Sequence, residues 1–188
     1  MKAFSLLAAL VCCASAHAGE ATVAVAANFA DPMRAIAAGF EKATGHTLKL
    51  STGATGKFYA QIVHGAPFAV LLAADDETPA RLMKEGRAVA GSAFTYATGR
   101  LVLWSADAAK VDKDGAVLKS GHFARLALAN PRLAPYGRAA LETLAALKVN
   151  VPEEKIVTGE NIAQTYQFAS TGNAELGFVA RSQVWKDG

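Results

Sequence analysis

The sequence predicts an α/β protein in which short apolar strands alternate with helices. Three strand–helix units follow one another between residues 21 and 86, and the same scheme returns between residues 125 and 180. Such alternation is typical of parallel sheets covered by helices. The 188 residues are 52% hydrophobic and 19% charged, a globular composition large enough for one sizeable core or two small lobes.

Residues 1–18 have the pattern of a secretory signal peptide. Lys2 precedes an apolar stretch from Phe4 to Cys13, and small residues alternate up to Ala18, after which we expect cleavage. Both cysteines precede that point, which excludes thiol catalysis, disulfides and cysteine metal sites from the mature chain. No later stretch approaches the roughly 20 apolar residues of a membrane span. We therefore expect an exported protein.

The first half of the mature chain is predicted to contain three strands, each followed by a helix. The strands are expected at residues 21–27, 47–51 and 69–74, and the helices at residues 31–45, 57–65 and 77–86. Asp31 as N-cap, Pro32 as first helical residue and Gly45 after the end delimit the first helix. The loop TGATG separates the second strand from its helix.

The second half begins with a long extended stretch at residues 94–106, interrupted by Gly99, which could carry the chain from one lobe to another. Further strands are expected at residues 125–131, 155–159 and 176–180, and helices at residues 136–149 and 161–172. We predict a first lobe at residues 19–93 and a second lobe at residues 94–188.

The turns that follow these strands are the candidate binding site. In open α/β sheets, ligands collect beyond the carboxyl ends of the strands. The turns in question are Asn28, the TGATG loop, Pro131 to Gly137, and Gly159 to Asn161. Four such turns on two lobes could face one cleft.

The TGATG loop lacks the Gly-Lys-Ser/Thr ending of a nucleotide phosphate loop. What remains is a helix N-terminus beside the hydroxyls of Ser51, Thr52 and Thr55, which suits an anion. The alternative is an ordinary turn in which Thr55 only caps the helix. Asn28 could likewise be a cap or a ligand donor, and Tyr136 could lie in the core or direct its hydroxyl into a cleft.

Other kinds of site have little support. The net charge of +3 is dispersed, which gives no indication of nucleic-acid binding. The four histidines are scattered and none has metal-ligand spacing. The acidic run from Asp75 to Glu77 could bind a hard cation, although it is better explained as charge in the first turn of a helix. Nothing resembles a Gly-x-Ser-x-Gly elbow, so nucleophilic catalysis has no candidate.

Six stretches of the mature chain together resemble one family, the periplasmic molybdate-binding proteins of molybdate ABC importers. They are VAVAANF (23–29), STGATGKFYAQI (51–62), HGAPFAVLLAADDETPARL (64–82), GSAFTYATGRLVLWS (91–105), LALANPRLAPYG (126–137) and NIAQTYQFASTGNAELGFVA (161–180). They cover nearly all of the mature chain in the order the family has them.

This resemblance implies a two-lobed periplasmic binding protein of type II-like fold, each lobe a βα sheet flanked by helices. It implies a monomeric periplasmic receptor, not an enzyme, that captures molybdate and also tungstate and delivers it to a membrane permease. No cofactor, no metal held directly by side chains and no nucleic acid are expected. The alternatives are a receptor for sulfate or another tetrahedral oxyanion, an exported α/β hydrolase, and the effector-binding half of a transcription regulator.

The resemblance also implies the residues that bind the oxyanion. They are Asn28, Thr55, Tyr136 and Ile162, the last through its backbone N–H, with backbone contributions from Ala27 and Ala54. Some family members have a tyrosine where this chain has Ala180, which puts a fifth donor in doubt unless Tyr136 replaces it. The family also continues into a further C-terminal segment that returns to the first lobe. We therefore expect the C-terminal part of the first lobe to be missing and apolar surface to be uncovered there.

Overall fold

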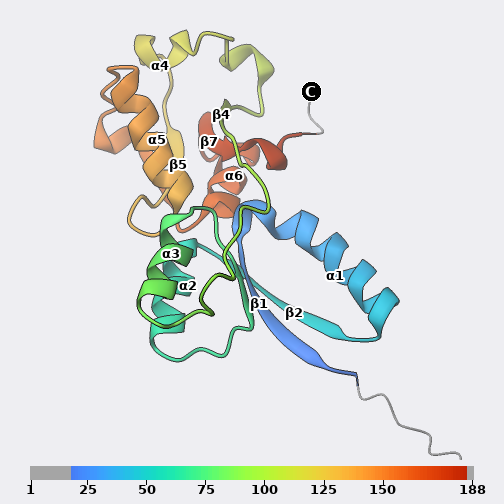
Figure 1. Cartoon of the computed structure of the whole chain (residues 1–188). Helices are drawn as coiled ribbons and strands as arrows, with labels where there is room; N and C mark the ends of the chain where they lie inside the picture. The colour runs from blue at the N-terminus through green and yellow to red at the C-terminus, as the bar shows by residue number, and fades with distance from the viewer. Residues whose placement is uncertain (1–17, 186–188) are drawn as a thin grey trace, which may run out of the picture.

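The computed structural model describes residues 18–185, which form two β-sheets with helices on both faces of each (Figure 1). We call the part of the chain around each sheet the first and the second lobe. This is the α/β architecture that the alternation of strands and helices predicts. Most of the predicted signal peptide, residues 1–17, lies outside the described residues.

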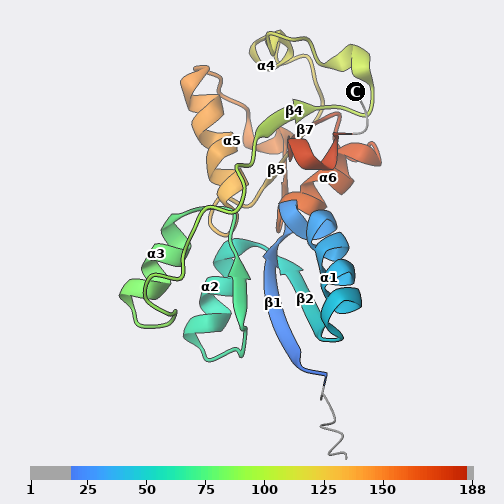
Figure 2. The same ribbon diagram turned by 45° about the vertical axis from the view of Figure 1, so that its right-hand side comes forward.

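The first lobe is built on three parallel strands in the order β2-β1-β3. Its elements are β1 (Glu20–Ala26), α1 (Ala30–Thr44), β2 (Thr47–Gly53), α2 (Thr55–Val63), β3 (Val70–Leu72) and α3 (Glu77–Lys84). The central strand β1 lies between the other two, with α1 on one side of the sheet and α2 on the other (Figure 2). Its residues Val23 to Ala26 are therefore at most 2% exposed.

The first helix does not begin as predicted. A 3-10 turn, η1 (Ala27–Phe29), leads directly into α1, so Phe29 takes the N-cap position and the side chain of Asp31 pairs with Arg34. Its end is as expected, because Gly45 adopts the left-handed conformation (φ 72°) that commonly terminates a helix.

The predicted loop at residues 52–56 is much shorter than expected. Strand β2 continues to Gly53 and α2 already begins at Thr55, so Ala54 alone connects them as the N-cap. The hydroxyl-bearing residue Thr55 is consequently the first residue of the helix rather than its cap.

The second lobe is built on four strands in the order β4-β7-β5-β6. Its strands are β4 (Leu101–Trp104), β5 (Leu126–Ala129), β6 (Ile156–Gly159) and β7 (Leu176–Ala180), and its helices are α4 (Ala116–Ser120), α5 (Pro135–Ala146) and α6 (Ile162–Ser170). Three short 3-10 turns, η2 (Ala108–Lys110), η3 (Glu153–Lys155) and η4 (Arg181–Gln183), complete it. Strand β5 is parallel to β6 and β7, whereas the edge strand β4 is antiparallel to β7.

Residues 85–100 contain no helix or strand and lead from α3 to β4. The predicted boundary between residues 93 and 94 falls within this connection. Of the extended stretch expected at residues 94–106, only β4 forms a ladder. Helix α4 was not predicted, because its single turn is too short to show a helical period.

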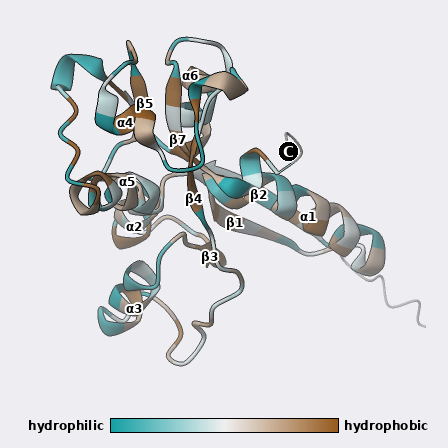
Figure 3. Cartoon of the chain, turned by 90° about the horizontal axis from the view of Figure 1, so that it is seen from above, coloured by the Kyte–Doolittle hydropathy of each residue, from teal (hydrophilic) through white to brown (hydrophobic). Residues whose placement is uncertain are grey.

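The core of the second lobe is a continuous apolar layer. Every residue of β5 and β7 is buried, as expected for strands covered by helices on both faces. Figure 3 shows strong apolar colour on these strands. In the first lobe, Ile36 and Phe40 of α1 and Val70 of β3 are exposed by 52%, 38% and 48%. Among the described residues, no helix is both long and apolar enough to cross a membrane.

The approach of α5 to β5 gives a test of this packing. A Cβ atom added at Gly137 would lie 2.2 Å from the carbonyl oxygen of Ala129, whereas one at Gly39, on the exposed side of α1, would meet no atom within 4 Å. We expect Gly137→Ala to lower the free energy of unfolding by about 1–3 kcal/mol through overpacking. Gly39→Ala should raise it by about 0.5–1 kcal/mol through helix propensity. Urea denaturation measures both, and equal effects would contradict the packing described.

Candidate functional site

The turns at the carboxyl ends of β1, β2, β3, β5 and β6 meet at the junction of the two lobes and form one pocket. Residues on both lobes line it: Ala26, Ala27, Asn28, Gly53, Ala54, Thr55, Ala74, Ala134, Pro135, Tyr136, Asn161 and Ile162. All six residues named in the sequence analysis as ligand contacts are among them. None of the lining side chains carries a charge at neutral pH. The free space between them is about 10 Å³, room for roughly one water molecule.

Thr55 is fixed in the pocket wall by the neighbouring strand. Its side chain is buried, and its Oγ1 accepts the backbone N–H of Ala74, which follows β3, at 3.0 Å. A hydroxyl that accepts a hydrogen bond still has its own proton to donate. The reading of Thr55 as a helix cap is therefore wrong, since Ala54 is the N-cap and Thr55 makes no capping bond. The backbone N–H of Thr55 also has no partner within the helix, as for any first helical residue.

Asn28 lies in the turn η1 directly after β1, beside Ala27. Its Oδ1 atom is buried and has no hydrogen-bond partner within residues 18–185. Buried polar atoms are nearly always paired in folded proteins, so an orphaned one in a pocket wall marks a place where a ligand can bind. The N-cap reading of Asn28 is wrong, because Phe29 holds that position. The carbonyl of Asn28 accepts the hydroxyl of Ser182 on the other lobe at 2.9 Å.

Tyr136, the second residue of α5, directs its ring into the junction and is 8% exposed. Burial raises the pKa of its hydroxyl above the usual value, and the neighbouring amide of Asn28 acts in the opposite direction. The hydroxyl therefore keeps its proton at neutral pH and can donate it. A Cβ atom at Gly99, in the connection before β4, would lie 2.2 Å from this hydroxyl oxygen, so a larger residue there would displace the Tyr136 hydroxyl.

Ile162 is the first residue of α6, and the amide of Asn161 caps that helix as predicted. The Asn161 Oδ1 accepts the backbone N–H of Ala163 and of Gln164, at 3.0 and 3.1 Å. The N–H of Ile162 precedes these two and has no acceptor within the helix. A third helix, α5, also begins at the pocket, with Pro135 in its first turn. The N-termini of α2, α5 and α6 thus meet where the sheets meet (Figure 2).

Ala180 ends β7 and is completely buried in an apolar cluster that includes Tyr136, Ala54 and Ile162. The small alanine side chain brings no donor to this cluster.

The acidic run after β3 is held by protein partners. Asp75 Oδ1 accepts the N–H of Thr78 in the first turn of α3, as the helix-charge interpretation predicts. Its Oδ2 accepts from Arg138 at 3.0 Å, and Glu77 accepts from the same guanidinium at 2.7 Å. These bonds, led by the one to Glu77, raise the pKa of Arg138 above its usual value. Within residues 18–185, no group of three His, Cys, Asp or Glu side chains is arranged to hold a metal ion.

Sequence reasoning missed the residues that position the donors: Ala74, Gly99 and Arg138. Ala74 acts through its backbone, and nothing in a sequence distinguishes such an alanine. Gly99 interrupts an apolar stretch, and a glycine in such a stretch indicates that another part of the protein or a ligand approaches the backbone closely. Lys57 is not a lining residue, and its Nζ instead lies 2.9 Å from Glu160 on the second lobe.

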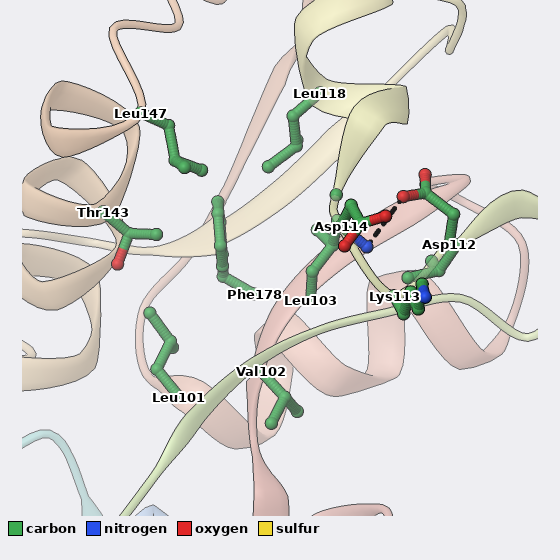
Figure 4. Close-up of a pocket in the computed structure, with 12 residues that line it drawn as sticks. Leu101, Val102, Leu103, Asp112, Lys113, Asp114, Leu118, Thr143, Leu147 and Phe178 are labelled. Carbon is green, nitrogen blue, oxygen red and sulfur yellow. Dashed lines mark hydrogen bonds between the residues drawn. The ribbon is translucent and has the colours of Figure 1, made fainter.

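A larger hollow of about 520 Å³ lies on the second lobe, away from these turns (Figure 4). Its floor is apolar, formed by Leu101, Leu103 and Phe178. The carboxylate of Asp112 at its rim accepts backbone N–H groups of the residues that lead into α4, and these bonds hold its pKa below the usual value. The polar side chains of this hollow, Asp112, Lys113, Asp114 and Thr143, all belong to the second lobe. The smaller pocket brings together turns from both lobes and is therefore the functional candidate.

Comparison of the sequence with known proteins identifies relatives that are solute-binding proteins. A profile of the bacterial extracellular solute-binding protein family matches residues 21–188. The molybdate-binding protein ModA of Azotobacter vinelandii is 59% identical over 185 residues, which cover 98% of this chain and 73% of that protein. ModA of Rhodobacter capsulatus is 54% identical over 90% of this chain and 67% of that protein.

A solved structure gives the same result. The periplasmic molybdate-binding protein of Azotobacter vinelandii superposes with a TM-score of 0.82 and 41% identity, over 85% of this chain and 71% of that one. The chain therefore belongs to the bacterial extracellular solute-binding protein family, and within it to the molybdate-binding proteins.

Proposed function

We propose that this protein captures molybdate between its two lobes and presents it to the membrane permease of an ABC importer. The observation that carries the proposal is the composition of the pocket at the junction, whose lining has donors and no charged side chain. The relatives with 59% and 54% identity bear the name molybdate-binding protein. We also propose that this protein acts by binding and not by catalysis.

The donors we assign are the hydroxyls of Thr55 and Tyr136, the amide of Asn28 and the backbone N–H of Ile162. The backbone of Ala27 and Ala54 completes the set. Rotating the Asn28 amide by 180° exchanges its oxygen and nitrogen at nearly equal size, which would turn the buried, unpartnered atom into a donor. Molybdate is a divalent tetrahedral anion that stays unprotonated at neutral pH, so a set made of donors alone matches it.

The helix N-termini supply the positive potential that charged side chains would otherwise provide. Three helices begin at the pocket, and each carries roughly half a positive elementary charge at its N-terminus. Each charge-assisted hydrogen bond adds roughly 1.5–3 kcal/mol net, so several together exceed an association cost of at least about 4 kcal/mol. The free space of about 10 Å³ is too small for a tetrahedral oxyanion, so the pocket must widen to hold one. Because both lobes line the pocket, entry and release of the anion also require the lobes to move apart.

Tungstate has the same charge and geometry as molybdate, and we propose that it binds at the same site. Sulfate also shares them and is excluded only by its smaller size, so a sulfate receptor is the alternative. We further propose that the mature protein is a monomer in the periplasm, exported by a signal peptide that is cleaved after Ala18.

Calorimetric titration of the protein with molybdate, tungstate, sulfate and phosphate tests the proposed function. We expect tight binding of molybdate and tungstate, much weaker binding of sulfate, and none of phosphate, which is partly protonated at neutral pH and requires an acceptor. Sulfate affinity comparable to that of molybdate would contradict the assignment and favour the alternative.

Two substitutions test the assigned donors. Thr55→Ala and Tyr136→Phe should each raise the Kd for molybdate about 10- to 100-fold, because each removes one charge-assisted hydrogen bond. Thr55→Ser, which retains the hydroxyl, should bind nearly as the parent does. The matched control is Tyr59→Phe, whose hydroxyl bonds Glu85 on the exposed surface of the first lobe and should leave affinity unchanged. Unchanged affinity in both pocket variants would place the site elsewhere.

A further inference from the structure

Two sets of charged side chains join the two lobes. In one set, Arg138 at the start of α5 donates to Glu77 at 2.7 Å and to Asp75 at 3.0 Å. In the other set, Lys57 in the first turn of α2 donates to Glu160, just before α6, at 2.9 Å. The charges are crossed, because the first lobe contributes the acids to one set and the base to the other.

The spacing of these residues links them to the proposed donors. Lys57 follows Thr55 by two positions, Arg138 follows Tyr136 by two, and Glu160 precedes Ile162 by two. Residues two apart on a helix are about 200° apart around its axis. When Thr55 or Tyr136 faces the ligand, the charged side chain two residues later therefore faces the rim of the pocket. The proposed donors and the charged residues therefore belong to the same short segments of the backbone.

The bonds to Asp75 have a second consequence. The side chain of Asp75 is only 13% exposed. In the sequence, Asp75 directly follows Ala74, which lines the pocket. With Oδ1 occupied by Thr78 and Oδ2 by Arg138, both oxygens are engaged by protein donors. Arg138 thereby compensates a negative charge next to a site for a dianion.

We propose that Arg138 with Asp75 and Glu77, and Lys57 with Glu160, form a two-point latch that stabilises the closed arrangement of the lobes and slows release of the bound oxyanion. The latch rests on the proposed function for its role, although its closing contacts do not require a ligand. Because its two sets are crossed, like charges meet if the lobes close in a wrong orientation. These residues act through the position of the donors and do not contact the ligand.

The first test measures equilibrium affinity and dissociation rate for sodium molybdate. Arg138→Gln should raise Kd about tenfold, mainly through faster dissociation, since it removes two charged hydrogen bonds and leaves Asp75 without a cationic partner. Lys57→Gln should raise Kd about two- to fivefold, as expected for a more exposed pair. The matched control is Lys110→Gln. Lys110 pairs with Glu175 at 3.3 Å within the second lobe, and its side chain is as exposed as that of Lys57. Effects no larger than those of this control would overturn the latch.

Exchanging the charges of Lys57 and Glu160 distinguishes loss of the latch from local damage to the fold. Lys57→Glu and Glu160→Lys should each weaken binding by placing like charges opposite one another. The double variant should recover most of the affinity, because it restores the pair with the charges reversed. Failure of the double variant to recover, in a protein with unchanged thermal stability, would contradict the proposal.

A third measurement needs no ligand. The two cysteines of the sequence precede Ala18, so spin labels can be placed at Lys42→Cys on α1 and Lys119→Cys on α4, both exposed. We expect the distance distribution between the labels to lengthen in Arg138→Gln, and in the parent when salt rises from about 0.05 M to about 1 M. An unchanged distribution overturns the latch even if molybdate binds. A changed distribution supports the latch even if the proposed ligand is wrong.

Discussion

The proposed role of the junction depends on one constraint: a buried divalent anion must be surrounded by hydrogen-bond donors when no cationic side chain reaches it. The fold meets this constraint by ending five strands from two sheets at the same place. Each strand delivers a turn or a helix N-terminus, and these supply hydroxyls, an amide and free backbone N–H groups. Gly56 lets the backbones of the two lobes approach closely, since a Cβ atom there would lie 2.9 Å from the carbonyl oxygen of Leu133.

The charged groups are arranged so that they do not disturb this site. Asp75 lies next to the pocket, yet both of its oxygens are used by Thr78 and Arg138. Lys57 lies two residues from Thr55, yet its ammonium pairs with Glu160 at the rim. The backbone N–H of Gly56 donates to the carbonyl of Leu133 at 2.8 Å, which holds the two lobes in direct contact beside these pairs. The proposed donors thus line the pocket, and the ion pairs lie outside its lining.

Strand and helix positions could be predicted well because apolar runs alternate with helical periods and glycine, proline and asparagine mark the boundaries. The cap at Asn161 and the end at Gly45 were predicted correctly, since their signals are local. The cap at Asp31 was wrong, because the turn η1 had already started the helix. The backbone of Ala74 and the partners of Arg138 could not be predicted, since they depend on contacts between distant segments. The pocket brings Asn28, Thr55, Tyr136 and Ile162 together, although their separate signals were ambiguous.

The most direct test of the central claim is a crystal structure of the protein with sodium molybdate, in which anomalous scattering locates the molybdenum atom. We expect one strong peak at the junction of the lobes, with molybdate oxygens about 3 Å from the hydroxyls of Thr55 and Tyr136 and from the backbone nitrogen of Ile162. A peak on the surface, or in the hollow beside Asp112, with no density at the junction would contradict this claim.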